Sequence, residues 1–417
     1  MFTLAFKSIR NRKFTTILTI VSISLSVTLL LGVERIRKEA RASFTNTISG
    51  TDLIVGARSG PVQLLLYAVF RIGNATNNIS WQSYQEIAHN PNIRWTIPIS
   101  LGDSHKGYRV MGTNSDYFEH LRFSGGRRLE IAKGQIFKQV FDAVLGAEVA
   151  RALGYRLGDQ IILAHGAGKV SFVQHADKPF KVVGILRKTG TPVDQTIHVR
   201  LEGIEAIHID WKDGAKIPWQ SISAQQALEM DLSPKAVTAF FVGLKSRIAA
   251  FGVQRFVNEY RQEPLLAILP GVALAELWEL IGVAEKALLV VSGFVVVVGL
   301  SGMLIALMTS LNERRREMAI LRSVGARPVD VFALIVGESA MLTISGVAAG
   351  VAMLYGLLLV GQPLMLSTFG LFIAIGGLSM YELTLIGIVC LAGLLTGIIP
   401  GYQTYRYSLA DGMTIRL

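Results

Sequence analysis

The hydrophobic positions of the chain form four long apolar runs and one long mixed region. Residues 14–33 and 287–311 carry no charged side chain, and further apolar runs cover 331–360 and 383–405. About 20 apolar residues in helical conformation are enough to cross the hydrocarbon core of a bilayer. The pattern therefore predicts four transmembrane helices, with a large region between the first and the second.

The mixed region between the first two runs predicts an α+β domain with its own core. Residues 180–185 have the composition of a strand, while Ser80 and Gly154 stand where helices begin and end. Residues 204–208 fit either a strand or a helix. The apolar stretch 62–70 is interpreted as a buried helix or strand rather than a membrane-touching element, and the role of residues 62–78 is left open.

These patterns divide the chain into nine segments. In order they are a cytoplasmic interfacial helix (1–13), transmembrane helix 1 (14–33), an extracytoplasmic α+β domain with helical stalk ends (34–282), transmembrane helix 2 (283–311), a cytoplasmic coupling segment (312–330), transmembrane helix 3 (331–360), an outer loop (361–382), transmembrane helix 4 (383–405) and a cytoplasmic tail (406–417).

The positive charges outside the large domain determine the predicted orientation. Outside 34–282, every Lys and Arg except Lys286 lies before the first span, in 312–330 or in the tail. Cytoplasmic loops carry an excess of Lys and Arg. Both termini and the coupling segment are therefore predicted in the cytoplasm, with residues 34–282 outside it.

The coupling segment, NERRREMAILRSVGARPVD, is short, strongly basic and amphipathic. Ile320, Leu321 and Val324 recur at helical spacing. Gly325 can end this helix in a left-handed cap, and Pro328 can begin the next one. On pattern alone the segment is either a solvated loop or a docking surface.

Composition and charge narrow the class of protein. The chain has 417 residues, 51% of them hydrophobic, and a mean hydropathy of +0.44, which is typical of a membrane protein with a large soluble part. The net charge of +11 comes without a nucleic-acid-binding motif, so no nucleic acid is expected as a partner. Cys390 is the only cysteine, which excludes an intrachain disulfide.

The coupling segment and two stretches of the mixed region resemble the FtsX/MacB-type ABC transporter permeases. The run RRREMAILRSVGARPVDV, followed by Glu338, Gly346 and Gly350, is similar to that family's signature, with mild departures at Met318 and at 323–324. The stretches 144–163 and 180–207 resemble the family's two-lobed periplasmic core domain. The resemblance implies a bacterial inner-membrane permease, homodimeric or paired with a similar permease, that docks a cytoplasmic ATP-binding subunit and contacts membrane lipids.

The resemblance and the amphipathic pattern together select candidate ATPase-coupling residues. These are Arg314, Arg315, Arg316, Glu317, Ile320, Leu321, Arg322, Val324, Gly325 and Glu338. An ionisable residue inside a span is costly and is usually paired. Glu338 is therefore expected either to pair with an arginine of the coupling segment or to lie in water at the interface.

Neither a catalytic site nor a cofactor is expected on this chain. Residues 166–170 lack the glycine spacing and the Ser/Thr of a phosphate-binding loop, so ATP and Mg²⁺ are expected on a partner ATPase. Of the seven histidines, His165, His175, His198 and His208 fall close together in sequence. They show no i,i+4 pair and no HExxH string, so no metal site is predicted.

Three functions remain open at this point. The first is conformational work in the periplasm, for efflux or for extraction of a lipid or lipoprotein, with a periplasmic adaptor or substrate protein as a further partner. The second is a signalling or scaffold role that controls a periplasmic or cell-wall enzyme. The third is a part in a metal-ion transport system.

Overall fold

The computed structural model describes residues 13–166, 175–212, 215–216, 222–313, 315–369 and 375–406. The predicted interfacial helix and cytoplasmic tail lie outside these residues, apart from Lys13 and Arg406. The chain divides into two compact units. One unit comprises residues 1–39, 282–364 and 373–417, and the other comprises 40–281 with 365–372.

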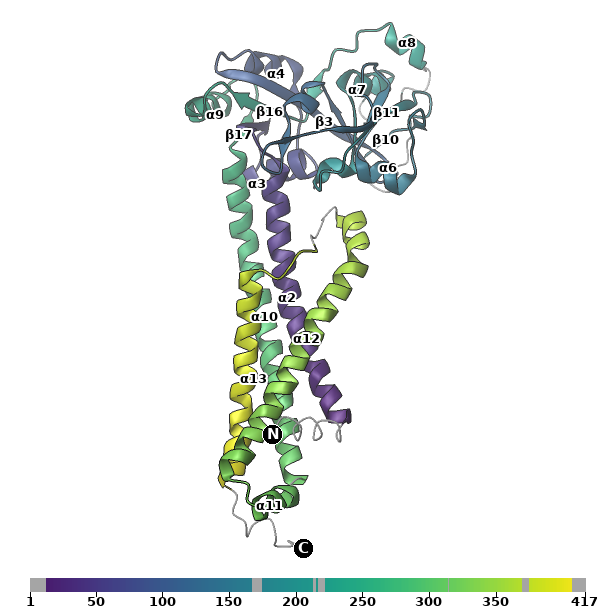
Figure 1. Cartoon of the computed structure of the whole chain (residues 1–417). Helices are drawn as coiled ribbons and strands as arrows, with labels where there is room; N and C mark the ends of the chain where they lie inside the picture. The colour runs from purple at the N-terminus through teal and green to yellow at the C-terminus, as the bar shows by residue number, and fades with distance from the viewer. Residues whose placement is uncertain are drawn as a thin grey trace. The chain divides into compact units, whose positions relative to one another are not determined.

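Four long helices account for the apolar runs (Figure 1). They are α2 (Lys13–Thr47), α10 (Pro270–Glu313), α12 (Pro328–Phe369) and α13 (Met380–Arg406), and each is long and apolar enough to cross a membrane. At 1.5 Å per residue, the 35 residues of α2 and the 44 of α10 extend about 50 and 65 Å. Both helices are thus longer than the ~30 Å hydrocarbon core requires.

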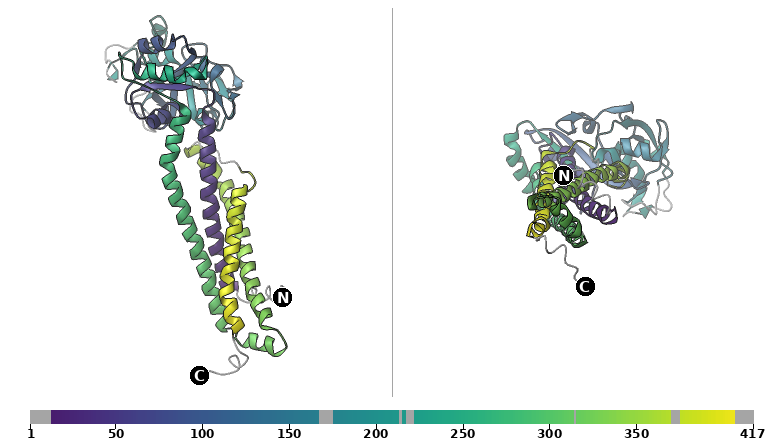
Figure 2. Two further views of the ribbon diagram at one scale, coloured as in Figure 1. Left: turned by 90° about the vertical axis from the view of Figure 1, so that its left-hand side faces the viewer. Right: turned by 60° about the horizontal axis from the view of Figure 1, so that its bottom comes forward.

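Small and hydroxylated residues lie where these helices approach one another, and Figure 2 shows the helices running alongside each other. The Ser26 hydroxyl of α2 donates to the Val295 carbonyl of α10 at 3.0 Å, and Thr28 donates to the Gly350 carbonyl of α12 at 3.0 Å. A Cβ added to Gly346 would lie 2.7 Å from the Ile23 side chain. Small residues allow such close approach between helices in lipid.

The predicted outer loop 361–382 is shorter than expected, because α12 continues through Gly361–Pro363 to Phe369. Residue 360, the predicted end of transmembrane helix 3, is therefore not the end of the helix. In an apolar environment an unpaired backbone group costs several kcal/mol, so a helix is favoured to continue wherever the sequence stays apolar. Residues 364–369 do stay largely apolar, and this outweighs the hydrogen bond that Pro363 removes.

The second unit is built on one eleven-stranded sheet, ordered β17-β1-β16-β3-β4-β12-β8-β11-β7, with β10 paired to β3 and β9 to β11. Its strands are β1 (Leu53–Ala57), β3 (Ile93–His105), β4 (Tyr108–Thr113), β7 (Ile131–Gly134), β8 (Asp142–Leu145), β9 (Gln160–Ile161), β10 (Ala164–His165), β11 (Phe180–Leu186), β12 (Thr196–Arg200), β16 (Ala239–Leu244) and β17 (Leu265–Ile268). The sheet is mixed, because β12 runs parallel to β4 and β8 runs parallel to β11, while the other pairs are antiparallel.

Shorter elements cover the sheet. The helices are α3 (Pro61–Leu65), η1 (Leu66–Phe70), α4 (Trp81–Ala88), α5 (Asp116–His120), α6 (Ala147–Leu153), η2 (Pro192–Gln195), α7 (Leu201–His208), α8 (Ala224–Leu228), η3 (Arg247–Ala249) and α9 (Ala250–Asn258). The remaining strands form three two-stranded pairs, β2 (Ile79–Ser80) with β15 (Ala236–Val237), β5 (Arg122–Phe123) with β6 (Arg127–Arg128), and β13 (Trp211–Lys212) with β14 (Ala215–Lys216).

Hydrophobic clusters at the two ends of the sheet explain how one sheet serves two lobes. Helices α4 and α9 pack on β1, β16 and β17 through residues such as Ile87, Val253 and Phe240. Helices α6 and α7 pack on β8, β11 and β12 through residues such as Val149 and Ile207. The strands between them, β3 and β4, join the two packed ends into one domain.

Several local predictions for this domain are confirmed. Ser80 caps α4, accepting a hydrogen bond from the Ser83 amide, and Gly154 ends α6 in the left-handed region. Residues 204–208 belong to helix α7 rather than to a strand. The apolar stretch 62–70 folds as α3 and η1, whose side chains, Leu64 through Phe70 with the exception of Leu66, are buried.

Candidate functional site

The coupling segment folds as a separate short helix, α11 (Arg315–Ser323), between α10 and α12. Gly325 has φ +104°, and the amides of Gly325 and Ala326 donate to the carbonyls of Arg322 and Leu321 at 3.1 and 3.0 Å. This is a Schellman cap. The predicted helix stop at Gly325 and the predicted start at Pro328 are both confirmed.

Helix α11 is attached to its neighbours by a small apolar cluster. Met318 is 5% exposed and packs with Leu311 at the end of α10 and with Val331 and Ile335 in the first turns of α12. The Arg327 amide donates to the Asp330 carboxylate at 2.9 Å and so fixes the start of α12. Helix α11 is therefore packed against both long helices rather than held in a loose loop.

Two further apolar residues of the segment face outward. Ile320 is 62% exposed and Val324 is 83% exposed, while Leu321 and Arg322 are half-buried. Arg315, Arg316 and Glu317 lie in α11, but their side chains and the whole of Arg314 fall outside the described residues. Two outward-facing apolar side chains on a basic helix form a surface that a partner protein could cover.

Glu338 lies in α12 and is 6% exposed. Its environment is therefore protein rather than water, and the alternative that it lies in water at the interface is not supported. The next residue, Ser339, donates to the Gly393 carbonyl of α13 at 2.6 Å. This part of α12 is thus a tightly packed face of the bundle.

A buried ion pair between α2 and α13 was not anticipated from the sequence. Arg35 donates to both carboxylate oxygens of Glu382, at 3.1 and 3.3 Å, and the two side chains are 4% and 1% exposed. Arg35 also donates to the carbonyls of Gly376 and Gly377 before α13. The available signal was that Glu382 is, with Glu338, one of only two acidic residues between 331 and 405.

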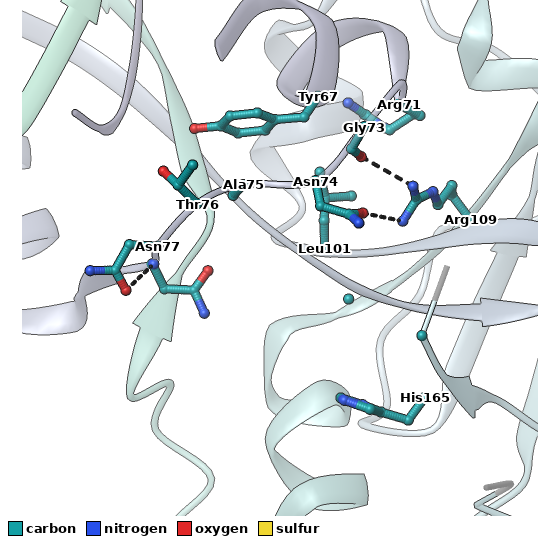
Figure 3. A pocket seen from close by; sticks show the side chains of 13 residues that line it. Tyr67, Arg71, Gly73, Asn74, Ala75, Thr76, Asn77, Leu101, Arg109 and His165 are labelled. Carbon is teal, nitrogen blue, oxygen red and sulfur yellow. Dashed lines mark hydrogen bonds between the residues drawn. The ribbon is translucent and has the colours of Figure 1, made fainter. Parts of the chain in front are cut away.

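Residues of the segment 62–78, for which the sequence suggested no role, line a pocket of about 420 Å³ in the outer domain (Figure 3). Arg109 donates to the Asn74 side chain and the Gly73 carbonyl, each at 3.1 Å, and so holds this segment against β4. Tyr67 and Arg71 lie on the same wall, and His165 lies on the opposite side of the pocket.

Four apolar helices, an α/β domain inserted after the first of them, and a basic helix joining the second and third together define a multi-pass membrane protein of the permease type. Residues 16–249 match the family described as MacB-like periplasmic core domain, and residues 289–409 match that described as FtsX-like permease C-terminal. The chain belongs to the FtsX/MacB family of ABC transporter permeases, which work with a cytoplasmic ATPase. The resemblance seen in the sequence is thereby confirmed.

A curated relative is the pyoverdine export ATP-binding/permease protein PvdT of Pseudomonas aeruginosa, 24% identical over 79% of this chain. The chain spans about half of that relative's length (46%). Among solved structures, the periplasmic region of MacB from Actinobacillus actinomycetemcomitans matches with a TM-score of 0.34 and 11% identity, covering 55% of this chain and 94% of that one. The extracellular domain of YknZ from Gram-positive bacteria matches with a TM-score of 0.30 and 12% identity, covering 52% and 99%.

Proposed function

We propose that this chain is the permease of an ABC exporter and converts ATP hydrolysis on a partner ATPase into movement of its outer domain. The observation that carries the proposal is α11, which exposes Ile320 and Val324 while Met318 anchors it to α10 and α12. A force applied to α11 moves two long helices together. The work is then done outside the membrane, and no substrate has to pass between the helices.

The family and the relative support export over a purely structural role. PvdT is named as a pyoverdine export protein that combines an ATP-binding and a permease part. By analogy, ATP and Mg²⁺ would be held by the ATPase. We propose a dimer of this chain, or of this chain with a similar permease, in the bacterial inner membrane, in contact with lipids and with a periplasmic adaptor or substrate protein.

The coupling proposal is tested by Arg322→Glu and Leu321→Asp. Reversing the charge leaves a partner's charged group unmatched, a loss of roughly 2–5 kcal/mol where the pair is buried. Leu321→Asp would place a charge in the apolar contact. Each variant is expected to lose the ATP-binding subunit when the permease is purified from native membranes, as measured by mass spectrometry of the bound proteins.

Two matched variants keep this test specific. Leu321→Met preserves an apolar side chain, and Lys286→Glu reverses an exposed charge within α10, outside the coupling segment; both should retain the ATPase. All four variants should insert and fold alike. If Arg322→Glu and Leu321→Asp still co-purify with the ATPase at the wild-type ratio, α11 is a solvated loop and a signalling or scaffold role gains support.

The proposed topology is tested by cysteine labelling in a Cys390→Ala background. Ile248 is 92% exposed in the outer domain and Val324 is 83% exposed beside α11. Ile248→Cys is expected to react with a membrane-impermeant maleimide on intact spheroplasts, and Val324→Cys only after lysis. Labelling of Val324→Cys before lysis, or of Ile248→Cys only afterwards, would reverse the orientation.

A further inference from the structure

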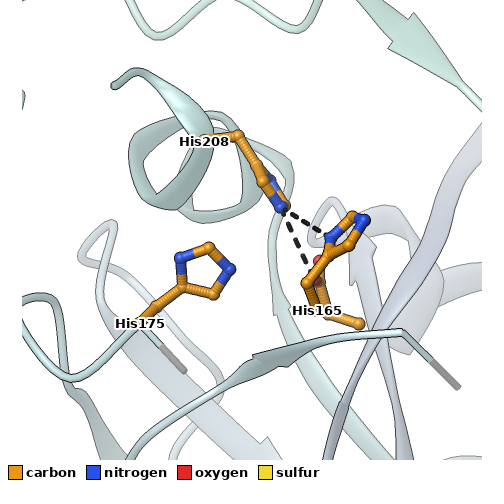
Figure 4. Close-up of side chains that lie close together, drawn as sticks. His165, His175 and His208 are labelled. Atoms are coloured by element: carbon orange, nitrogen blue, oxygen red, sulfur yellow. Dashed lines mark hydrogen bonds and ion pairs between the residues drawn. The ribbon is translucent and has the colours of Figure 1, made fainter. Parts of the chain in front are cut away.

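Four side chains of metal-ligating type converge in the outer domain from four separate segments. Asp103 lies in β3, His165 in β10, His175 in the turn before β11, and His208 at the end of α7. One ligand atom from each lies within 4.8 Å of the others. Figure 4 shows the three imidazole rings turned toward a common space, with dashed lines leading from His208.

The sequence prediction of no metal site rested on the absence of closely spaced ligands. The sheet topology instead assembles the four side chains from positions far apart in the chain. Of the four histidines noted in the sequence, His165, His175 and His208 belong to the cluster, and Asp103 joins them. His198 does not; it is buried in β12.

The distances within the cluster fit a tetrahedral ion. Ligand atoms about 2.0–2.1 Å from a central zinc ion are about 3.3 Å apart along each edge of a tetrahedron. His165 Nδ1 lies 3.3 Å from both His208 Nε2 and Asp103 Oδ1, and His208 Nε2 lies 3.5 Å from Asp103 Oδ1. Three atoms therefore already stand at the spacing of one tetrahedral face, and His175 is placed to supply the fourth.

Hydrogen bonds outside the cluster orient its members. Asp103 and His165 are a cross-strand pair of β3 and β10, so their side chains lie on the same face of the sheet. The His208 Nδ1 atom bonds to the Ile204 carbonyl at 2.9 Å, which leaves Nε2 facing the cluster. A carbonyl that holds the second ring nitrogen is the usual support for a metal-bound histidine.

A backbone hydrogen bond and an ion pair hold the turn that contains His175 in place. The His175 amide donates to the Leu163 carbonyl at 2.8 Å. Lys178, three residues on, forms a fully buried ion pair with Asp210 at 2.8 Å, and Asp210 follows the end of α7. This pair holds the His175 turn beside His208, and its carboxylate neutralises the charge of Lys178.

Burial makes the cluster costly without a ligand. Asp103 and His175 are each 2% exposed. Within the described residues, His175 Nε2 is buried and has no hydrogen-bond partner, a state that costs about 1–3 kcal/mol. Burial and the neighbouring His208 charge lower the pKa of His175 to about 4, so the ring is neutral at pH 7 and keeps a lone pair.

We propose that Asp103, His165, His175 and His208 bind one zinc ion. Imidazole and carboxylate ligands in tetrahedral arrangement suit Zn²⁺, whereas Cu⁺ prefers thiolate and thioether ligands. His165 is 44% exposed at its side chain and also lines the pocket described above, which provides a route for the ion. The Trp211 ring packs against the His175 ring, with the two ring centroids 4.7 Å apart.

The alternative is a cluster held by hydrogen bonds and an ion pair alone. Burial by itself would raise the pKa of Asp103, but hydrogen bonds from His165 and His208 lower it to about 2. Burial likewise opposes protonation of His208, yet its contact with Asp103 raises its pKa. These two shifts are those of an Asp103–His208 ion pair that needs no metal.

The test uses the full-length protein, purified in detergent through a tag that contains no histidine. After removal of metals, zinc is titrated against a chromophoric chelator, and Co²⁺ is added separately. The wild type is expected to bind one zinc per chain, to show the intense visible absorption of four-coordinate Co²⁺, and to unfold at a higher temperature with zinc than without it.

Variants connect the binding to these residues. His165→Ala and His208→Asn should each lower the affinity for zinc by more than the ~10–100-fold that loss of an outer-shell partner costs. They should also abolish the Co²⁺ absorption and the thermal shift. The control His89→Ala removes an exposed histidine outside the cluster and should change none of these. His165 lies at the surface, so its substitution tests the site without disturbing the core.

Two results would overturn the proposal. One is a wild-type protein that binds less than 0.2 equivalents of zinc at micromolar concentration, which would leave the hydrogen-bonded ion pair as the role of the cluster. The other is zinc binding that His165→Ala and His208→Asn leave unchanged, which would place the ion elsewhere.

Discussion

Glu382→Ala is expected to lower the free energy of unfolding by roughly 3–5 kcal/mol, because it leaves a buried guanidinium without its carboxylate. In the folded protein Arg35 and Glu382 form a two-oxygen contact that is almost fully buried. Glu382 also accepts a hydrogen bond from the Ser379 amide at 2.6 Å. The substitution therefore removes both the link between α2 and α13 and the cap of α13.

The measurement is unfolding of the detergent-solubilised chain in mixed micelles, followed by intrinsic fluorescence. The matched control is Glu285→Ala, because Glu285 contacts Arg37 at 3.9 Å and both side chains are partly exposed; a loss of at most about 1 kcal/mol is expected. The double variant Arg35→Met/Glu382→Leu removes both charges and should recover most of the stability. Equally small losses of unfolding free energy for Glu382→Ala and Glu285→Ala would show that the buried pair contributes no more to stability than the exposed pair.

A second large effect is expected when the pH is lowered. His198 in β12 is fully buried, bonds through Nδ1 to the Val144 carbonyl at 3.2 Å and lies against the ring of Tyr117. Burial, and the nearby charge of Arg71, lower its pKa from 6.5 to about 3. Between these two values the unfolded chain binds a proton that the folded chain does not. Stability is therefore lost as the pH falls below 6.5, by roughly 3 kcal/mol at about pH 4.

The substitution His198→Leu isolates this contribution. It removes the titrating ring, so its stability should fall less steeply than that of the wild type between pH 7 and pH 4. Other groups, including Asp103 and His208, titrate equally in both proteins and cancel in the comparison. His89→Leu, at an exposed histidine, should follow the wild-type curve. Parallel pH profiles for wild type and His198→Leu would contradict the prediction.

The sequence alone determined the features that depend on neighbouring residues. The four apolar runs correspond to α2, α10, α12 and α13 because length and apolar composition are sufficient for a membrane helix. Gly325 ends α11 and Ser80 begins α4 because each cap needs only a few consecutive residues. The long family signature around α11 identified the class of protein for the same reason, because it is one continuous motif.

Only the tertiary structure decided which distant residues meet. Arg35 and Glu382 are far apart in sequence, and the residues around each of them do not indicate its partner. The strand pairing of β3 with β10 and the packing of α7 brought Asp103, His165 and His208 together, where sequence spacing predicted no site. A long-range contact is set by the path of the whole chain and by the burial it achieves, and a pattern read over a few residues contains neither.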